Sequence, residues 1–248
     1  MHLLIKKDYE GLSSWAADYI IKRINKFSPT EEKPFVLGLP TGSSPLGVYK
    51  NLISACKEGK VSFKNVITFN MDEYVGLTAD HPQSYIYFMK ENFFNHIDIL
   101  PENTHILNGM AKNVEAECLA YEKAIKAAGG VELFLGGTGG NGHIAFNEPG
   151  SPIDSRTRVV NLTDETRIAN ARFFDENMEK VPTKALTIGI ATIMNAKEVI
   201  ILASGRQKAH AVKAAIKGPA CQECPLSYLQ KHPNAILAYD EEAAEDSN

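Results

Sequence analysis

Short apolar runs alternate along the chain with longer segments in which apolar side chains recur every three or four residues. Such runs predict buried strands, and the three- and four-residue spacing predicts the apolar face of a helix. The predicted strands lie at 3–5, 35–39, 66–70, 131–135, 198–203 and 235–239, with a further apolar run at 185–193. The predicted helices lie at 12–27, 84–94, 114–128 and 209–216, and another begins near 45.

This alternation predicts the fold class. Strands that alternate with helices form parallel β–α–β units, so we expect an α/β fold: a single-domain, Rossmann-like, doubly wound and mostly parallel sheet with helices on both faces. No internal repeat or linker interrupts the pattern, so residues 1–248 are predicted to form one domain. The acidic end at 241–248 is predicted to be disordered. The polar segment 163–181 has no clean period, and we interpret it as a candidate flap over a ligand.

Composition and charge narrow the class of partner. The chain has 248 residues, of which 44% are hydrophobic and 23% charged, and its net charge of −4 provides no basic field for nucleic acid or anionic lipid. We therefore expect a small-molecule or protein partner. The first residues show no secretory signal, and no apolar run approaches the roughly 20 residues of a membrane helix, so a cytoplasmic location is predicted.

The cysteines and scattered histidines give weak signals. Cys221 and Cys224 form a C-x-x-C pair, but no second Cys or His pair lies at zinc spacing, so we interpret them as ordinary thiols. His81, His96 and His105 share no spacing and are expected to be structural or surface residues. No metal site is predicted.

A glycine-rich loop follows the predicted strand at 131–135. The sequence 131–151 reads VELFLGGTGGNGHIAFNEPGS, with six glycines between 136 and 150, and it holds His143 and Glu148. Glycine lets the backbone approach a ligand closely, so this strand end is a candidate site in which both side chains face the ligand. An ordinary glycine-rich turn is the alternative.

A second loop has the composition of an anion site. The strand at 35–39 leads into Thr41, Gly42, Ser43 and Ser44 just before a predicted helix, where free N–H groups and the helix dipole converge. The loop matches neither the P-loop nor the dinucleotide-binding pattern, so it favours a monophosphate over a nucleotide. A simple capped turn is the alternative.

Three charged residues are further candidates for a site at the strand ends. Asp72 lies just past the strand at 66–70, where open α/β sheets collect active residues. Arg172, in the candidate flap, is a candidate anion clamp, and Lys208 stands at a predicted helix start where it could meet a phosphate. Solvated loop or surface residues are the alternative for each.

Several motifs carry a family resemblance over residues 1 to about 240. PFVLGLPTGSSP, TFNMDEYVGL, GHIAFNEPGS, SRTR, ANARFF and the Lys of SGRQKA occur in the order found in glucosamine-6-phosphate deaminases (isomerases), and the chain resembles this family. The resemblance implies a C–N hydrolase that converts D-glucosamine 6-phosphate and water to D-fructose 6-phosphate and ammonia without metal or coenzyme. It also implies a homo-oligomer, a hexamer or smaller.

The resemblance assigns roles to the candidate residues. Asp72 matches the base that moves a proton between C2 and C1, and His143 matches the acid–base that opens the sugar ring, with Glu148 as its orienting partner. The catalytic set would be Asp72, Asn141, His143 and Glu148, and the substrate-binding set Thr41, Gly42, Ser43, Ser44, Gly137, Arg172 and Lys208.

Two features depart from the family pattern. Asn141 stands where the family has Asp; a neutral amide is expected to give His143 a weaker, tautomer-ambiguous bond and to slow ring opening. Pro152, Val160 and Asn161 replace polar or basic residues of the allosteric forms, so activation by N-acetylglucosamine 6-phosphate is predicted to be weak or absent.

Two other functions stay open. A 6-phosphogluconolactonase-like hydrolase would share the fold, but lactone hydrolysis has no use for a proton-shuttling Asp72. A catalytically impaired sensor would bind sugar phosphates tightly without releasing ammonia.

Overall fold

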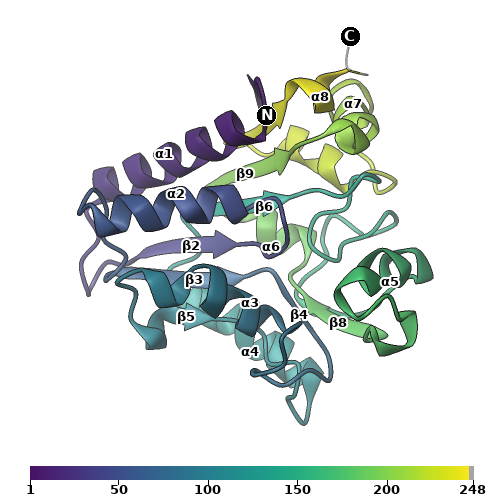
Figure 1. Cartoon of the computed structure of the whole chain (residues 1–248), viewed down its shortest axis with the longest axis horizontal. Coiled ribbons are helices and arrows are strands. Elements are labelled where there is room, and N and C mark those ends of the chain that lie inside the picture. The colour runs from purple at the N-terminus through teal and green to yellow at the C-terminus, as the bar shows by residue number, and fades with distance from the viewer. Residues whose placement is uncertain (246–248) are drawn as a thin grey trace.

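The computed structural model describes residues 1–245 and is built on a seven-stranded parallel sheet (Figure 1). In spatial order its strands are β1 (His2–Lys6), β10 (Ala235–Asp240), β9 (Glu198–Ala203), β6 (Leu133–Gly137), β2 (Phe35–Leu39), β3 (Val66–Asn70) and β5 (Thr104–His105). Every neighbouring pair is parallel. The predicted α/β fold with a mostly parallel sheet is confirmed.

Helices cover both faces of this sheet because successive strand side chains point to opposite sides. Val36 and Ile201 pack toward one apolar cluster, and their neighbours Leu37 and Ile200 pack toward another. The first cluster includes side chains from α4 (Val114–Ala127), α6 (Ile190–Met194) and α7 (Ala209–Lys217), and the second includes side chains from α1 (Tyr9–Phe27), α2 (Leu46–Lys57) and α3 (Tyr85–Asn92).

The strand order creates a crevice between β2 and β6. From β2 the chain continues outward to β3 and β5, then returns to β6 and continues the other way to β9 and β10. Loops that leave neighbouring strands in opposite directions open a gap at the carboxyl ends, where ligands bind in open α/β sheets. Gly38 makes this pairing close, since a Cβ there would stand 2.4 Å from the ring of Phe134.

A second, antiparallel sheet was not foreseen from the sequence. It joins β4 (Asp72–Tyr74), β8 (Lys184–Thr187) and β7 (Arg158–Asn161) in the order β4-β8-β7. The apolar run at 185–193 divides between β8 and α6 because the backbone turns at Gly189, where a Cβ would stand 2.0 Å from the Ser155 carbonyl oxygen. This small sheet positions Asp72 beside the crevice.

Two other predictions need adjustment. The chain after Asp240 forms the short helix α8 (Glu241–Ala244), capped by the Asp240 carboxylate, so the predicted disorder is wrong for 241–245. Residues 246–248 of that prediction lie outside the described residues. The candidate flap contains α5 (Asp164–Asn170) and the short 3-10 helices η3 (Ala171–Phe173) and η4 (Met178–Lys180). The assignment of 1–248 to one domain stays a prediction.

Within residues 1–245, no helix is both long and apolar enough to cross a membrane.

Candidate functional site

A cavity of about 780 Å³ lies at the carboxyl ends of β2 and β6. It is bounded by the loops that follow these strands, by β4, by the segment around α5 and by the start of α7. All of the predicted site residues except Glu148 line it: Thr41, Gly42, Ser43, Ser44, Asp72, Gly137, Asn141, His143, Arg172 and Lys208. The structure therefore brings segments distant in the sequence to one cavity.

The loop after β6 folds back on itself and places His143 at the cavity. The N–H of Gly139 donates to the His143 carbonyl at 3.1 Å, and the Gly142 N–H donates to the Gly139 carbonyl at 3.1 Å. The Thr138 hydroxyl also donates to the His143 carbonyl, at 3.0 Å. A Cβ on Gly139 would stand 2.1 Å from the imidazole, so this loop needs glycine for the ring to occupy its place.

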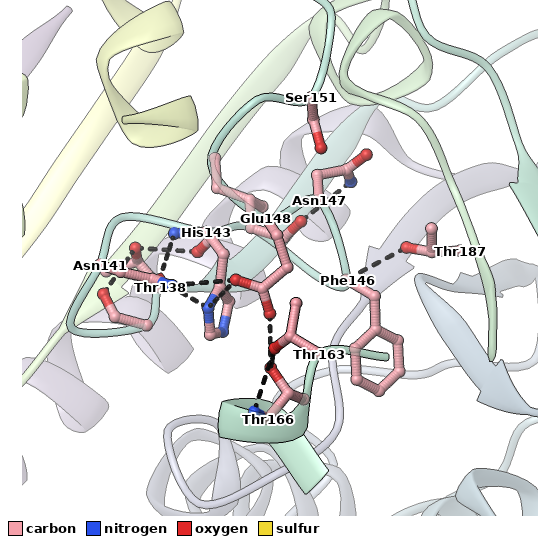
Figure 2. A network of polar contacts seen from close by, with 12 residues as sticks. Thr138, Asn141, His143, Phe146, Asn147, Glu148, Ser151, Thr163, Thr166 and Thr187 are labelled. Carbon is pink, nitrogen blue, oxygen red and sulfur yellow. Dashed lines mark hydrogen bonds and ion pairs between the residues drawn. The ribbon is translucent and has the colours of Figure 1, made fainter. Parts of the chain in front are cut away.

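Asn141 lies between His143 and Glu148 (Figure 2). Its Nδ2 donates to Glu148 Oε2 at 2.9 Å, and its Oδ1 lies 2.8 Å from His143 Nδ1. The direct distance from His143 Nδ1 to Glu148 Oε2 is longer, 3.5 Å. The amide is therefore the nearest partner of the imidazole and connects it to the carboxylate.

This bridge specifies the tautomer of His143. A carboxylate oxygen only accepts, so the contact with Glu148 fixes which end of the Asn141 amide carries the N–H groups. The amide oxygen then faces Nδ1 and can only accept, so Nδ1 carries a proton, and in the neutral imidazole the lone pair is on Nε2. These contacts favour the Nδ1–H form of His143, and the expected weakening of its bond by Asn141 stays a prediction.

Glu148 lies behind His143 and does not line the cavity. Its Oε1 accepts a 2.7 Å hydrogen bond from the Thr166 hydroxyl of α5. Burial raises the pKa of the Glu148 carboxyl, but the contact with His143, which carries charge when its imidazole is protonated, and the hydrogen bonds from Thr166 and Asn141 outweigh it and lower the pKa to about 2. Glu148 is thus an ionised carboxylate that can orient its neighbours.

Asp72 is a buried carboxylate at the cavity wall. It is 7% exposed, and its Oδ1 has no hydrogen-bond partner among the described residues. Burial and the negative charge of Glu73 raise its pKa to about 8. Buried polar atoms without partners are rare, and a carboxyl with a raised pKa is a strong candidate for a general base.

Glu73 points away from the cavity and holds the start of α3. Its carboxylate accepts hydrogen bonds from the N–H groups of Tyr74 at 2.8 Å, Tyr85 at 3.0 Å and Ile86 at 3.0 Å. A carboxylate at a helix N-terminus is favoured by the free N–H groups and the dipole. Burial raises the pKa of Glu73 although these N–H groups oppose the shift, and its ionised form places a negative charge beside Asp72.

The loop at 41–44 lines the end of the cavity next to α2. α2 begins without a side-chain cap, and the first of its N–H groups, that of Leu46, donates to the Ser43 carbonyl at 3.4 Å. The hydroxyl of Tyr9 steadies the loop: it lies 2.9 Å from the Ser43 carbonyl and accepts from the Gly47 N–H at 2.8 Å. The four residues of the predicted anion site thus line the cavity, and their role as phosphate ligands stays a prediction.

Arg172 and Lys208 add positive charge to the cavity. Burial and the charge of Arg172 lower the pKa of the Lys208 ammonium. An anion between these two cations would stabilise both of them, and a phosphate carries enough charge for both.

An aromatic wall was missed by the sequence reasoning. Tyr74, Tyr85, Phe146 and Phe174 line the cavity, and the Tyr74 ring centre lies 4.9 Å from that of Tyr85 and 5.8 Å from that of Phe146. These residues come from β4, α3 and two loops, so no periodicity joins them in the sequence.

The cysteine pair supports the loop after β6 from behind. Cys221 and Cys224 are free thiols, and the segment they bracket binds the loop through Gly150 N–H to Gln222 O at 2.7 Å. No group of three or more His, Cys, Asp or Glu side chains in residues 1–245 is arranged to hold a metal ion.

The chain is similar to proteins of one family over nearly its whole length. Residues 7–237 match the family described as glucosamine-6-phosphate isomerases/6-phosphogluconolactonase. A glucosamine-6-phosphate deaminase of Treponema denticola is 59% identical over 246 residues, which cover 99% of this chain and 91% of the relative. One from Porphyromonas gingivalis is 58% identical over 243 residues, covering 98% and 92%.

Solved structures are also similar to this chain. A structure described as a monomeric glucosamine-6-phosphate deaminase matches with a TM-score of 0.92 at 43% identity, covering 99% of this chain and 100% of that one. A 6-phosphogluconolactonase from Thermotoga maritima matches with a TM-score of 0.75 at 20% identity, covering 97% and 99%. The second likeness shows the shared fold alone.

Proposed function

The chain belongs to the family of glucosamine-6-phosphate isomerases and 6-phosphogluconolactonases, and we propose that it is a glucosamine-6-phosphate deaminase. The reaction converts D-glucosamine 6-phosphate and water to D-fructose 6-phosphate and ammonia. The observation that carries the proposal is one cavity lined by a buried carboxylate, Asp72, an oriented imidazole, His143, and a cationic, hydroxyl-rich end. The proposed substrate needs one group of each kind.

The phosphate would bind at the α2 end. The loop 41–44 offers hydroxyls and N–H groups, Gly137 lets this loop approach β6, and Arg172 and Lys208 supply charge. The phosphate does not react, so its binding energy positions the sugar for the steps at C1 and C2.

Ring opening would fall to His143. The substrate is mostly a closed pyranose, and opening it requires a proton to leave the C1 hydroxyl and a proton to reach the ring oxygen. Nε2 of the Nδ1–H tautomer can take the first proton and deliver one to the ring oxygen. Asn141 and Glu148 would hold the ring in place for this transfer.

Isomerisation would fall to Asp72. Removal of the C2 proton from the open-chain amino aldehyde and its return to C1 produce a ketose imine, which water hydrolyses to fructose 6-phosphate and ammonia. A carboxylate whose pKa lies near 8 is a stronger base than an ordinary one. The ammonium on C2 would favour the ionised form of Asp72 when the substrate binds.

Asn141 is proposed to slow ring opening without preventing it. The amide contacts Nδ1 of His143 at 2.8 Å, but it brings no charge to stabilise the imidazolium that forms during proton transfer. Enolisation by Asp72 is unaffected because it uses a different residue.

Assays in parallel test this function. The chain is incubated with glucosamine 6-phosphate while ammonia and fructose 6-phosphate are measured, and separately with 6-phosphogluconolactone while acid release is measured. Equal amounts of ammonia and fructose 6-phosphate support the deaminase. Lactone hydrolysis without ammonia release would show that the chain is a lactone hydrolase and not a deaminase. Tight binding of the sugar phosphate without turnover would show that it is a sensor.

Assembly and activation stay predictions. A homo-oligomer, a hexamer or smaller, is predicted, whereas the solved relative at 43% identity is described as monomeric, and light scattering decides between them. Weak or absent activation by N-acetylglucosamine 6-phosphate stays a prediction that rests on Pro152, Val160 and Asn161.

A further inference from the structure

A chain of hydrogen bonds runs from the flap helix α5 to the imidazole of His143 (Figure 2). The Thr163 hydroxyl donates to the Thr166 hydroxyl at 3.0 Å, and Thr166 donates in turn to Glu148 Oε1 at 2.7 Å. Glu148 Oε2 accepts from Asn141, whose Oδ1 faces His143 Nδ1. A side chain on the flap is therefore connected to the group proposed to open the sugar ring.

The direction of the Thr166 hydroxyl is set by its neighbours. Its oxygen accepts the Thr163 proton, so its own proton is free for Glu148, and a carboxylate can only accept. Thr163 is also the cap of α5, because its Oγ1 accepts the Thr166 N–H at 3.2 Å. The helix start thus presents one directed donor to the carboxylate.

Thr166 also completes the set of contacts that holds the Glu148 carboxylate. Oε2 is bound by the Asn141 amide and Oε1 by Thr166, so both oxygens have a directed donor. With Thr166 removed, the carboxylate keeps one of these donors and can rotate about its last torsion, which is broad and two-fold. The Asn141 amide would then lose its fixed partner, and with it the orientation that selects the Nδ1–H tautomer of His143.

We propose that Thr166 is a positioning residue: its hydroxyl, presented by the flap helix, holds Glu148 so that Asn141 keeps His143 in the tautomer and orientation required for ring opening. The proposal rests on the proposed function. Arg172 follows on η3, the short helix that continues α5, so one segment of chain serves both the phosphate end and the ring-opening end of the cavity.

Three variants test the role. Thr166→Val keeps the branched shape and removes the hydroxyl, Thr166→Ser keeps the hydroxyl, and Ile168→Ala changes a 63% exposed side chain on the same helix. Thr166→Val removes a hydrogen bond to a charged group. We therefore expect its kcat to be about 10- to 100-fold lower than that of the parent, with KM within about threefold. Thr166→Ser is expected to recover most of kcat, and Ile168→Ala to match the parent.

Nitrogen NMR of ring-labelled histidine reads the tautomer without activity. The parent and Thr166→Ser are expected to show His143 protonated at Nδ1, and Thr166→Val a mixture of both tautomers. Where the Val variant does not fold, Thr166→Ala, a better helix former, takes its place. If the parent releases no ammonia, the proposed function fails while this spectrum still tests Thr166.

An unchanged kcat in Thr166→Val, a rise in KM alone, or a His143 signal that keeps the Nδ1–H tautomer would overturn the proposal. So would a Thr166→Ser variant as impaired as Thr166→Val, because the effect would then belong to side-chain shape and not to the hydroxyl.

Discussion

The amide of Asn141 donates to the carboxylate of Glu148 across 2.9 Å and in doing so turns its oxygen toward His143. Glu148 and His143 are five residues apart in a glycine-rich loop, and the amide fills the space between them. A residue that the family resemblance marks as a departure is therefore well suited to its surroundings. It gives the imidazole a defined tautomer, although it gives no charge.

Asn141→Asp is expected to turn over faster than the parent. The carboxylate would stabilise the imidazolium, and we expect a gain of about tenfold in kcat, well below the ~10⁴-fold effect of a comparable change in a serine protease. The new charge would face Glu148 at short range, so a lower Tm is also expected. Steady-state kinetics and thermal melts measure both. Equal turnover would show that the amide costs nothing in ring opening.

Asp72→Asn is expected to lose deamination while it keeps binding. The amide has nearly the same shape but cannot accept the C2 proton, and general-base contributions of about 10²–10⁴-fold set the scale of the loss in kcat. Fructose 6-phosphate should still raise the Tm of the variant, because the 41–44 loop, Arg172 and Lys208 are untouched. A variant with near-parental ammonia release would remove Asp72 from the mechanism.

Glu73→Gln is expected to move the acid limb of the pH profile. The parent needs ionised Asp72, whose pKa lies near 8, so kcat/KM should rise with pH toward that value. Four buried tyrosines also face Asp72: Tyr49, Tyr74, Tyr85 and Tyr121. Burial raises their pKa values, so they stay neutral, and Glu73 is the charged neighbour of Asp72. Removal of that charge should shift the limb to lower pH by roughly half a unit or more. An unmoved limb contradicts the electrostatic role of Glu73.

Asp72 also makes folding stability depend on pH. Its pKa is about 8 in the folded chain against 3.8 for the free group, so the folded state binds more protons than the unfolded state between these values. Stability therefore falls as pH rises through this window. Asp72→Asn lacks the titrating carboxyl group. Its free energy of unfolding should therefore exceed that of the parent by a margin that grows from about pH 4 to about pH 8 and reaches on the order of a few kcal/mol. Urea melts at several pH values measure the gap; a constant gap would contradict the raised pKa.

The parts of the fold that depend on the local pattern of apolar residues could be predicted from the sequence. The strands β2, β3 and β9 lie at the predicted residues because each is a short buried run with clear ends. The strand predicted at 131–135 lies two residues later, at Leu133–Gly137, because its glycines pair with β9 in place of beginning the loop.

What the sequence left open depends on contacts between distant segments. β4 and β7 are short and take their partners from β8, so no local period marks them. The order of hydrogen bonds around Glu148 was hidden for the same reason, since Thr166 reaches it from 18 residues away. The acidic composition of the tail suggested disorder, but the Asp240 cap and the buried Ala243 outweigh it in α8.

The most direct measurement follows deuterium during turnover in heavy water. Glucosamine 6-phosphate is converted in D₂O, ammonia is measured, and NMR locates deuterium in the fructose 6-phosphate formed. A single carboxylate that moves a proton between C2 and C1 on one face of the sugar predicts ammonia in equal amount to fructose 6-phosphate, with deuterium at only one of the two C1 positions. Label on both C1 positions, or no fructose 6-phosphate at all, would contradict a cavity in which Asp72 and His143 act on the same hexose phosphate.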